Sequence, residues 1–263
     1  MDNSILTILT ASSYLLISGY QFWLLKKQNN NHIRQVAVLS ILPINMHGYL
    51  LHMSIDTVAG QNLSMLNIYS MTFWIIAIAL MFSSLIKKLE VLVMAVFPVS
   101  ALLVVLSSMS TDHHIIDASS PGYLIHILIA IASISILGLA AIQSVFVTML
   151  DNRLKRAPTK INLALPALQD MEKFLYFLVA FGFVLLSLAI ITAILFMPST
   201  GGGIPLHKPI LSVISWLVFA VFLVGRFKKG WRGKIAASWT ITGFLFLFLA
   251  YFGTRTVIEF ILG

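Results

Sequence analysis

The sequence predicts an all-α integral membrane protein, a bundle of about eight transmembrane helices with both termini outside. First, 59% of the 263 residues are hydrophobic and 10% are charged, whereas about 25% are charged in soluble domains. Second, apolar runs of about 20 residues recur, which is the length needed to cross roughly 30 Å of hydrocarbon. Third, Lys and Arg gather in every second loop, as in proteins whose cytoplasmic loops are basic.

The apolar runs place the spans at residues 5–25, 33–54, 66–86, 90–109, 123–150, 174–197, 208–226 and 235–260. All but two of the 17 Lys and Arg lie in or beside the loops that this arrangement makes cytoplasmic. An even number of spans then returns the carboxyl terminus to the outside. Because no aqueous segment exceeds about 25 residues, we expect a single polytopic membrane domain over residues 1–263.

Several spans carry features that bear on their packing. Lys26 follows the first apolar run and no basic residue precedes it, so we expect a span and not a cleaved signal peptide. Pro43 and Pro98 lie inside spans and can kink them, either for packing or to open a cavity. The fifth span contains small residues from Ala132 to Ala141, which let another helix approach closely. We therefore expect that span to be central.

Composition also excludes several functions. The chain has no cysteine, so it performs no thiol-disulfide exchange and holds no Cys-ligated metal or Fe–S cluster by itself. Its formal charge is +8, but these charges mark loops and form no basic face interleaved with aromatics. Nucleic-acid binding is therefore not expected. The lipid bilayer is the expected partner.

The last two spans form a hairpin around a short basic turn, Gly230-Trp231-Arg232-Gly233. This G-W-R-G turn follows a helix that opens on His207-Lys208, and it precedes an aromatic-rich helix that contains A-Y-F-G at 250–253. These features resemble the cytochrome c assembly family, which includes CcsA, CcmC and CcmF. In its length and in these sequence motifs, the chain most resembles the short YpjD-like inner-membrane branch of that family. The similarity covers most of the chain and is densest over 123–263. The resemblance implies a multi-pass protein of the bacterial inner membrane that handles haem.

Three histidines are candidate iron ligands. His126 lies about one turn into the fifth span, in a segment that resembles the family's H-V-x-M-M-x-x-S-Y, whose His ligates haem at the outer face. His207 opens the seventh span before Pro209, so a capping or interfacial role is the alternative. His47 lies about 10 Å inside the outer end of the second span. An ionisable residue at that depth normally faces a partner, and a structural hydrogen bond to a neighbouring helix is the alternative.

Two imidazoles from different helices can hold a b-type haem iron in an apolar groove. We expect His126 and His207 to be the ligands, with His47 as the third candidate, in a groove between the second, fifth and seventh spans. Lys208 and Arg255 are the two basic residues predicted outside, and either could pair a haem propionate. An ion pair between Arg255 and Glu259, four residues apart, is the alternative use.

The chain departs from the larger family members at its outer face. The loop from Pro198 to His207 lacks their Trp-rich segment, approximately W-G-x-x-W-x-W-D, and no His follows Thr254. We therefore expect a haem-binding or haem-handling factor, or an accessory to one, that works with other membrane proteins of cytochrome assembly and is not an enzyme by itself. The alternative is a non-haem auxiliary subunit or transporter-associated protein that kept the scaffold.

Overall fold

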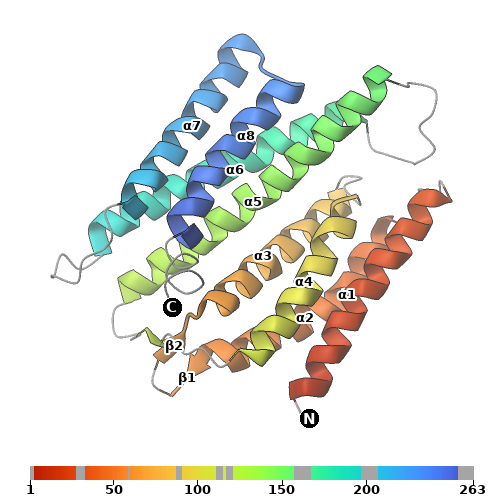
Figure 1. Cartoon of the computed structure of the whole chain (residues 1–263), viewed down its shortest axis with the longest axis vertical. Coiled ribbons are helices and arrows are strands. Elements are labelled where there is room, and N and C mark those ends of the chain that lie inside the picture. The colour runs from red at the N-terminus through yellow and green to blue at the C-terminus, as the bar shows by residue number, and fades with distance from the viewer. Residues whose placement is uncertain are drawn as a thin grey trace. The chain divides into compact units, whose positions relative to one another are not determined.

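The computed structural model describes residues 3–27, 33–58, 60–86, 91–110, 115–116, 121–156, 167–196 and 207–253. Within these residues, eight helices are long and apolar enough to cross a membrane (Figure 1). They are α1 (Asn3–Lys26), α2 (Ile33–Ile55), α3 (Met65–Ile86), α4 (Val91–Met109), α5 (Pro121–Arg156), α6 (Leu168–Phe196), α7 (His207–Lys229) and α8 (Gly233–Phe248). The predicted all-α membrane fold is confirmed.

The helices group into two compact units. Unit 1 comprises Met1–Ser119 with Ala157–Ala167, and unit 2 comprises Ser120–Arg156 with Leu168–Gly263. Unit 1 therefore contains α1 to α4 and unit 2 contains α5 to α8. That the two units form one membrane domain, as the sequence predicts, stays a prediction.

Unit 1 is a four-helix bundle in which α1 packs on α4 and α2, and α3 packs on α2 and α4. The rings of Tyr14 and Phe97 meet edge to face at 5.0 Å in its core. Trp74 of α3 lies against Gly48 of α2, where a Cβ would be only 2.9 Å from the indole. The missing side chain lets the indole Nε1 donate to the Ile44 carbonyl at 2.8 Å. A small residue thus sets the approach of α2 and α3.

A small antiparallel sheet also belongs to unit 1. Its strands, in spatial order, are β1 (Asp56–Thr57), β2 (Gly60–Asn62) and β3 (Ile115–Ile116). The Asn67 side chain of α3 donates to the Asn62 carbonyl at 3.0 Å and ties β2 to the bundle. The sequence did not predict this sheet, because strands of two or three residues are too short to show alternation.

In unit 2, α5 packs along both α6 and α8, and α7 packs on the same two helices. The approach is close where one helix offers a glycine. A Cβ on Gly182 would lie 2.6 Å from the Leu137 side chain, and one on Gly243 would lie 2.8 Å from the Phe219 ring. Ser215 of α7 also donates to the Gly243 carbonyl at 2.8 Å. In both contacts the small residue is a glycine, one on α6 and one on α8, and it lets the neighbouring helix approach closely.

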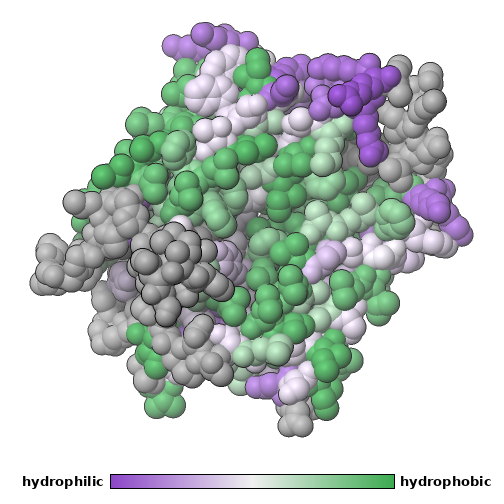
Figure 2. All heavy atoms as spheres, in the orientation of Figure 1, coloured by the Kyte–Doolittle hydropathy of each residue, from purple (hydrophilic) through white to green (hydrophobic). Residues whose placement is uncertain are grey.

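The helix ends differ most from prediction at the charged end of unit 2. There α5 continues to Arg156, beyond the predicted 150, and α6 begins at Leu168, before the predicted 174. An ion pair between Lys155 and Asp151, at 2.7 Å and one turn apart, stabilises the added turn of α5. Figure 2 shows hydrophilic residues gathered at the end where α7 turns into α8, with mostly apolar residues along the helices. Near its other end α8 passes into a π-helical turn, Leu249–Gly253.

The side of the membrane on which each loop and terminus lies stays a prediction. Because basic loops are retained in the cytoplasm, a reporter fused after Lys160 or Lys229 should be cytoplasmic, and one after Ser119 or Gly202 should be outside. Paired phosphatase and fluorescent-protein fusions measure this. If the fusions after Lys160 and Lys229 reported the same side of the membrane as those after Ser119 and Gly202, the result would contradict an eight-span topology.

Candidate functional site

The five residues proposed from the sequence are placed unequally by the structure. His126 on α5 belongs to unit 2, as do His207 and Lys208 on α7, whereas His47 on α2 belongs to unit 1. The side chain of His207 and all of Arg255 lie outside the described residues. The shared groove of His47, His126 and His207 therefore remains a prediction.

His126 is held between α5 and α6. It follows Pro121, the first residue of α5, by about 8 Å along the helix, and it is 8% exposed. Its Nδ1 lies 3.0 Å from the Ala189 carbonyl oxygen and 3.2 Å from the Thr192 hydroxyl oxygen, both on α6. No described residue hydrogen-bonds to its Nε2. One ring nitrogen thus has partners on α6, and the other has none among the described residues.

The start of α5 reaches α6 because Gly122 has no side chain. A Cβ at that position would overlap the Phe196 ring near the end of α6. Further along, the Ser133 hydroxyl donates to the Gly182 carbonyl at 3.4 Å. These two contacts lie on either side of His126 in α5 and hold its side chain against α6.

His47 has a different environment in the core of unit 1, where it is 1% exposed. Its Nδ1 lies 3.2 Å from the Tyr14 hydroxyl, and its Nε2 lies 2.9 Å from the Ser70 hydroxyl. Ser70 in turn accepts from Ser107 at 3.4 Å, so the chain of hydrogen bonds joins α1, α2, α3 and α4. Both ring nitrogens are engaged, which is the arrangement expected of a structural histidine. His47 would have to give up one of these bonds to ligate iron.

The donor set suits haem better than a bare metal ion. Among the described residues, no three His, Asp or Glu side chains gather into a metal site. A haem iron is held by the four nitrogens of its own porphyrin and needs only axial ligands from the protein. His126, a buried imidazole whose Nε2 has no partner among the residues that the structure describes, fits that need.

At the other end of unit 2, the structure shows why the G-W-R-G turn contains two glycines and a tryptophan. Gly230 and Gly233 have φ values of +65° and +55°, in the left-handed region that favours glycine. The Gly230 amide donates to the Arg226 carbonyl at 3.1 Å, so a carbonyl in the last turn of α7 has a hydrogen-bond partner. Trp231 stacks on Trp239 of α8, with ring centroids 5.3 Å apart. The glycines are needed for the backbone, and the tryptophan packs the turn onto the next helix.

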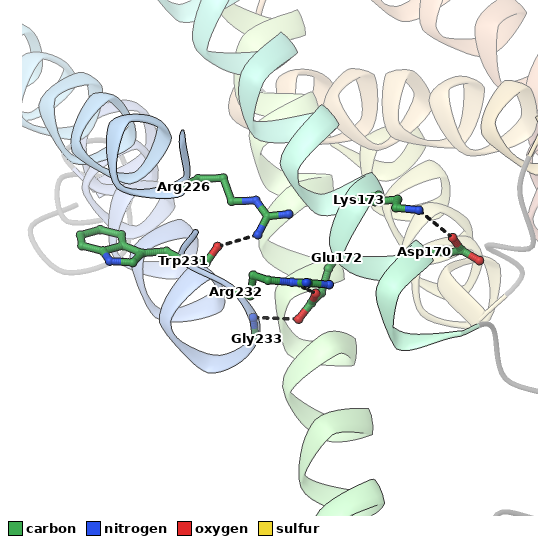
Figure 3. A network of polar contacts seen from close by, with 7 residues as sticks. All are labelled: Asp170, Glu172, Lys173, Arg226, Trp231, Arg232 and Gly233. Carbon is green, nitrogen blue, oxygen red and sulfur yellow. Dashed lines mark hydrogen bonds and ion pairs between the residues drawn. The ribbon is translucent and has the colours of Figure 1, made fainter. Parts of the chain in front are cut away.

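Glu172 of α6 fastens this turn and was missed as a functional residue. Figure 3 shows its carboxylate between Arg232 and Gly233. The Arg232 Nε donates to Oε2 at 2.9 Å, and the Gly233 backbone amide donates to Oε1 at 2.9 Å. The Glu172 side chain is only 10% exposed, because the first amide of α8 and the Arg232 guanidinium take the place of water around its carboxylate.

The comparison with known proteins gives the family of the chain. The family described as Cytochrome C assembly protein matches residues 40–262. The chain belongs to the cytochrome c assembly protein family. The match includes α3 to α8 in full and the larger part of α2.

Individual proteins are similar to this chain over different lengths. Inner membrane protein YpjD of Escherichia coli K12 is 28% identical over 238 residues, 89% of this chain and 90% of that protein. Cytochrome c biogenesis protein CcsA of Trichodesmium erythraeum is 30% identical over 107 residues, 40% of this chain and 29% of that protein. The CcsA of Cyanophora paradoxa is 34% identical over 87 residues, 32% and 27% respectively. No solved structure matches the chain.

Together with the eight apolar helices, the YpjD relative identifies this cytochrome c assembly family member as a multi-pass protein of the bacterial inner membrane. Residues missed by the sequence reasoning are Ala189, Thr192 and Glu172. Thr192 carried a signal, since it is a polar residue in an otherwise apolar stretch of its span. Ala189 carried none, because its contribution is a backbone carbonyl.

Proposed function

We propose that this member of the cytochrome c assembly family binds haem through His126 and handles it for cytochrome assembly. The observation that carries the proposal is the buried His126, whose Nδ1 is held by α6 while Nε2 has no partner among the described residues. Family membership supports a haem-handling role in the membrane. A buried imidazole of this kind is a strong ligand for haem iron.

Different residues of the chain would bind the iron and the propionates of haem. When bound, haem would supply the iron that His126 ligates, and His207, as the first residue of α7 in the same unit, is the proposed second ligand. Lys208 and Arg255 are proposed to pair the propionates. The chain would hold haem and pass it to other membrane proteins without transforming it, so we propose no catalytic activity.

A non-haem auxiliary subunit is the second candidate function, and one observation favours it. The segment from Pro198 to His207, which is predicted to lie outside, contains no Trp, whereas the resemblance to the larger family members leads us to expect a Trp-rich haem-presenting segment there. A chain that kept the scaffold without this segment could serve an assembly as a structural subunit.

Purification tests these alternatives directly. If the protein handles haem, isolation from its native membranes should yield a pigment with a Soret band, and haemin added to the pigment-free protein should restore the band at close to one haem per chain. The partners that co-purify should include membrane proteins of cytochrome assembly. Absence of the band even after haemin is added would favour the auxiliary-subunit alternative.

A further inference from the structure

We infer that the Ala189 carbonyl and the Thr192 hydroxyl fix His126 in the tautomer that carries its proton on Nδ1. The Nε2 lone pair is then the atom offered to haem iron. The role of this tautomer in haem binding rests on the proposed function, but the tautomer itself can be measured without haem. Thr192 acts in this scheme as a positioning residue.

The first step is the contact with Ala189. A backbone carbonyl oxygen carries no proton and can only accept a hydrogen bond. It lies 3.0 Å from Nδ1 of His126, so an unprotonated Nδ1 would bring two lone pairs face to face in a buried site. The contact is favourable only if Nδ1 donates. A neutral imidazole has one protonated nitrogen, so Nε2 then keeps its lone pair.

The second step is the orientation of the Thr192 hydroxyl. Its own proton has carbonyl acceptors on α6, at 2.9 Å from Leu188 and 3.1 Å from Ala189. With its proton directed to a carbonyl, the hydroxyl presents an oxygen lone pair to Nδ1 of His126 at 3.2 Å. The Nδ1 proton therefore has two acceptors within one turn of α6. A tilt of the ring toward either one weakens the bond to the other, so the pair sets the plane of the imidazole.

The third step is what this bond does for a ligand. A histidine that ligates a metal usually donates its other ring N–H to a carbonyl, carboxylate or water, which orients the ring and raises its basicity. The pair on α6 supplies that partner to His126 in advance. His47 has no such arrangement, because both its nitrogens meet hydroxyl groups.

The tautomer can be read from the haem-free protein by ¹⁵N NMR with labelled histidine. His126→Ala identifies the signals of this residue by their loss. We expect a protonated Nδ1 and an unprotonated Nε2 at a pH where the imidazole is neutral. A proton on Nε2 would overturn the inference, even if haem binding still requires His126.

The role of Thr192 is tested with haemin titration of three variants. Thr192→Val keeps the shape and removes the acceptor, so we expect haem affinity to fall about tenfold, the lower end for loss of a partner to a metal ligand, with a shifted Soret band. Thr192→Ser should restore both. Thr148→Val removes a hydroxyl that is also half-buried and also bonded one turn back, to the Ser144 carbonyl of α5, and should change neither.

Two outcomes separate this inference from the proposed function. If Thr192→Val binds haem with unchanged affinity and spectrum, the positioning role fails while His126 remains the proposed ligand. If His126→Ala binds haem as the original protein does, the proposed function fails whichever nitrogen carries the proton.

Discussion

Replacing His126 with Ala should cause the largest loss of haem among the histidine variants, because no other side chain can take the place of an iron ligand. The loss of affinity should exceed the roughly 10–100-fold that follows removal of a ligand's hydrogen-bond partner. Haemin titration followed by the Soret band measures it. The helical content should be unchanged, since α5 remains packed along α6 and α8.

Alanine variants of the other histidines provide the comparison for His126→Ala. His207→Ala should have the next largest effect, and an iron that keeps only one imidazole should change its spectrum before the pigment is lost. His113→Ala and His114→Ala, in residues predicted to form an outer loop, should leave the spectrum unchanged. If His126→Ala behaves like His113→Ala, the haem-handling proposal is wrong.

His47→Ala gives a contrast of another kind. It removes the shared partner of Tyr14 and Ser70, two hydroxyl-bearing side chains that are fully buried. Ser70 keeps its hydrogen bond from Ser107, whereas the Tyr14 hydroxyl loses its partner, and an unsatisfied buried group costs about 1–3 kcal/mol. We expect a lower melting temperature with an unshifted Soret band in the molecules that remain folded.

The spans of the fold could be predicted because the bilayer imposes one rule on every part of the chain. Each apolar run had to become a helix, since no water is present to bond the backbone. The ends of α5 and α6 lie where that rule no longer applies. There Asp151 pairs with Lys155, and Glu172 bonds to the hairpin, so contacts outside the hydrocarbon decide how far the helices extend.

The candidate site could be predicted only in part. The position of His126 followed from its resemblance to a family segment, but its partners did not. Ala189 contributes a backbone carbonyl, which every residue has, and only the packing of α6 on α5 selects this one. Similarly, the sequence marks His47 as unusual, but it does not show that hydroxyl groups on α1 and α3 occupy both nitrogens.

The G-W-R-G turn shows the same limit at the other end of unit 2. Its glycines are a readable signal of left-handed backbone, and φ is positive at both. The residue that fastens the turn is 58 positions or more away in the sequence, since Glu172 precedes Gly230. Nothing in the local pattern of α6 indicates that this carboxylate meets the start of α8.

Replacing Glu172 with Ala should therefore destabilise the last hairpin more than any other charge removal in unit 2. The carboxylate accepts the first amide of α8, where Arg232 at the N-cap position offers no side-chain cap of its own. Loss of a helix cap costs about 1 kcal/mol, and a hydrogen bond to a charged group contributes about 1.5–3 kcal/mol. The Arg232 side chain is 52% exposed, so water compensates part of that second contribution. We expect a loss of about 2–3 kcal/mol in the free energy of unfolding.

Asp170→Ala is the matched control, one turn or less away on the same helix. Its carboxylate lies 3.9 Å from the Lys173 ammonium, and both side chains are more than half exposed, so its removal should cost at most about 0.5 kcal/mol. Glu172→Gln should lie between the two, because the amide oxygen can still accept from Gly233 while the charge opposite Arg232 is gone. Thermal unfolding of the purified protein gives the ranking. Since the chain has no cysteine, a single Cys introduced in place of Ala237, which is 1% exposed, reports separately whether α8 opens, by its rate of thiol labelling. Equal melting temperatures and labelling rates for Glu172→Ala and Asp170→Ala would show that the carboxylate does not hold the hairpin.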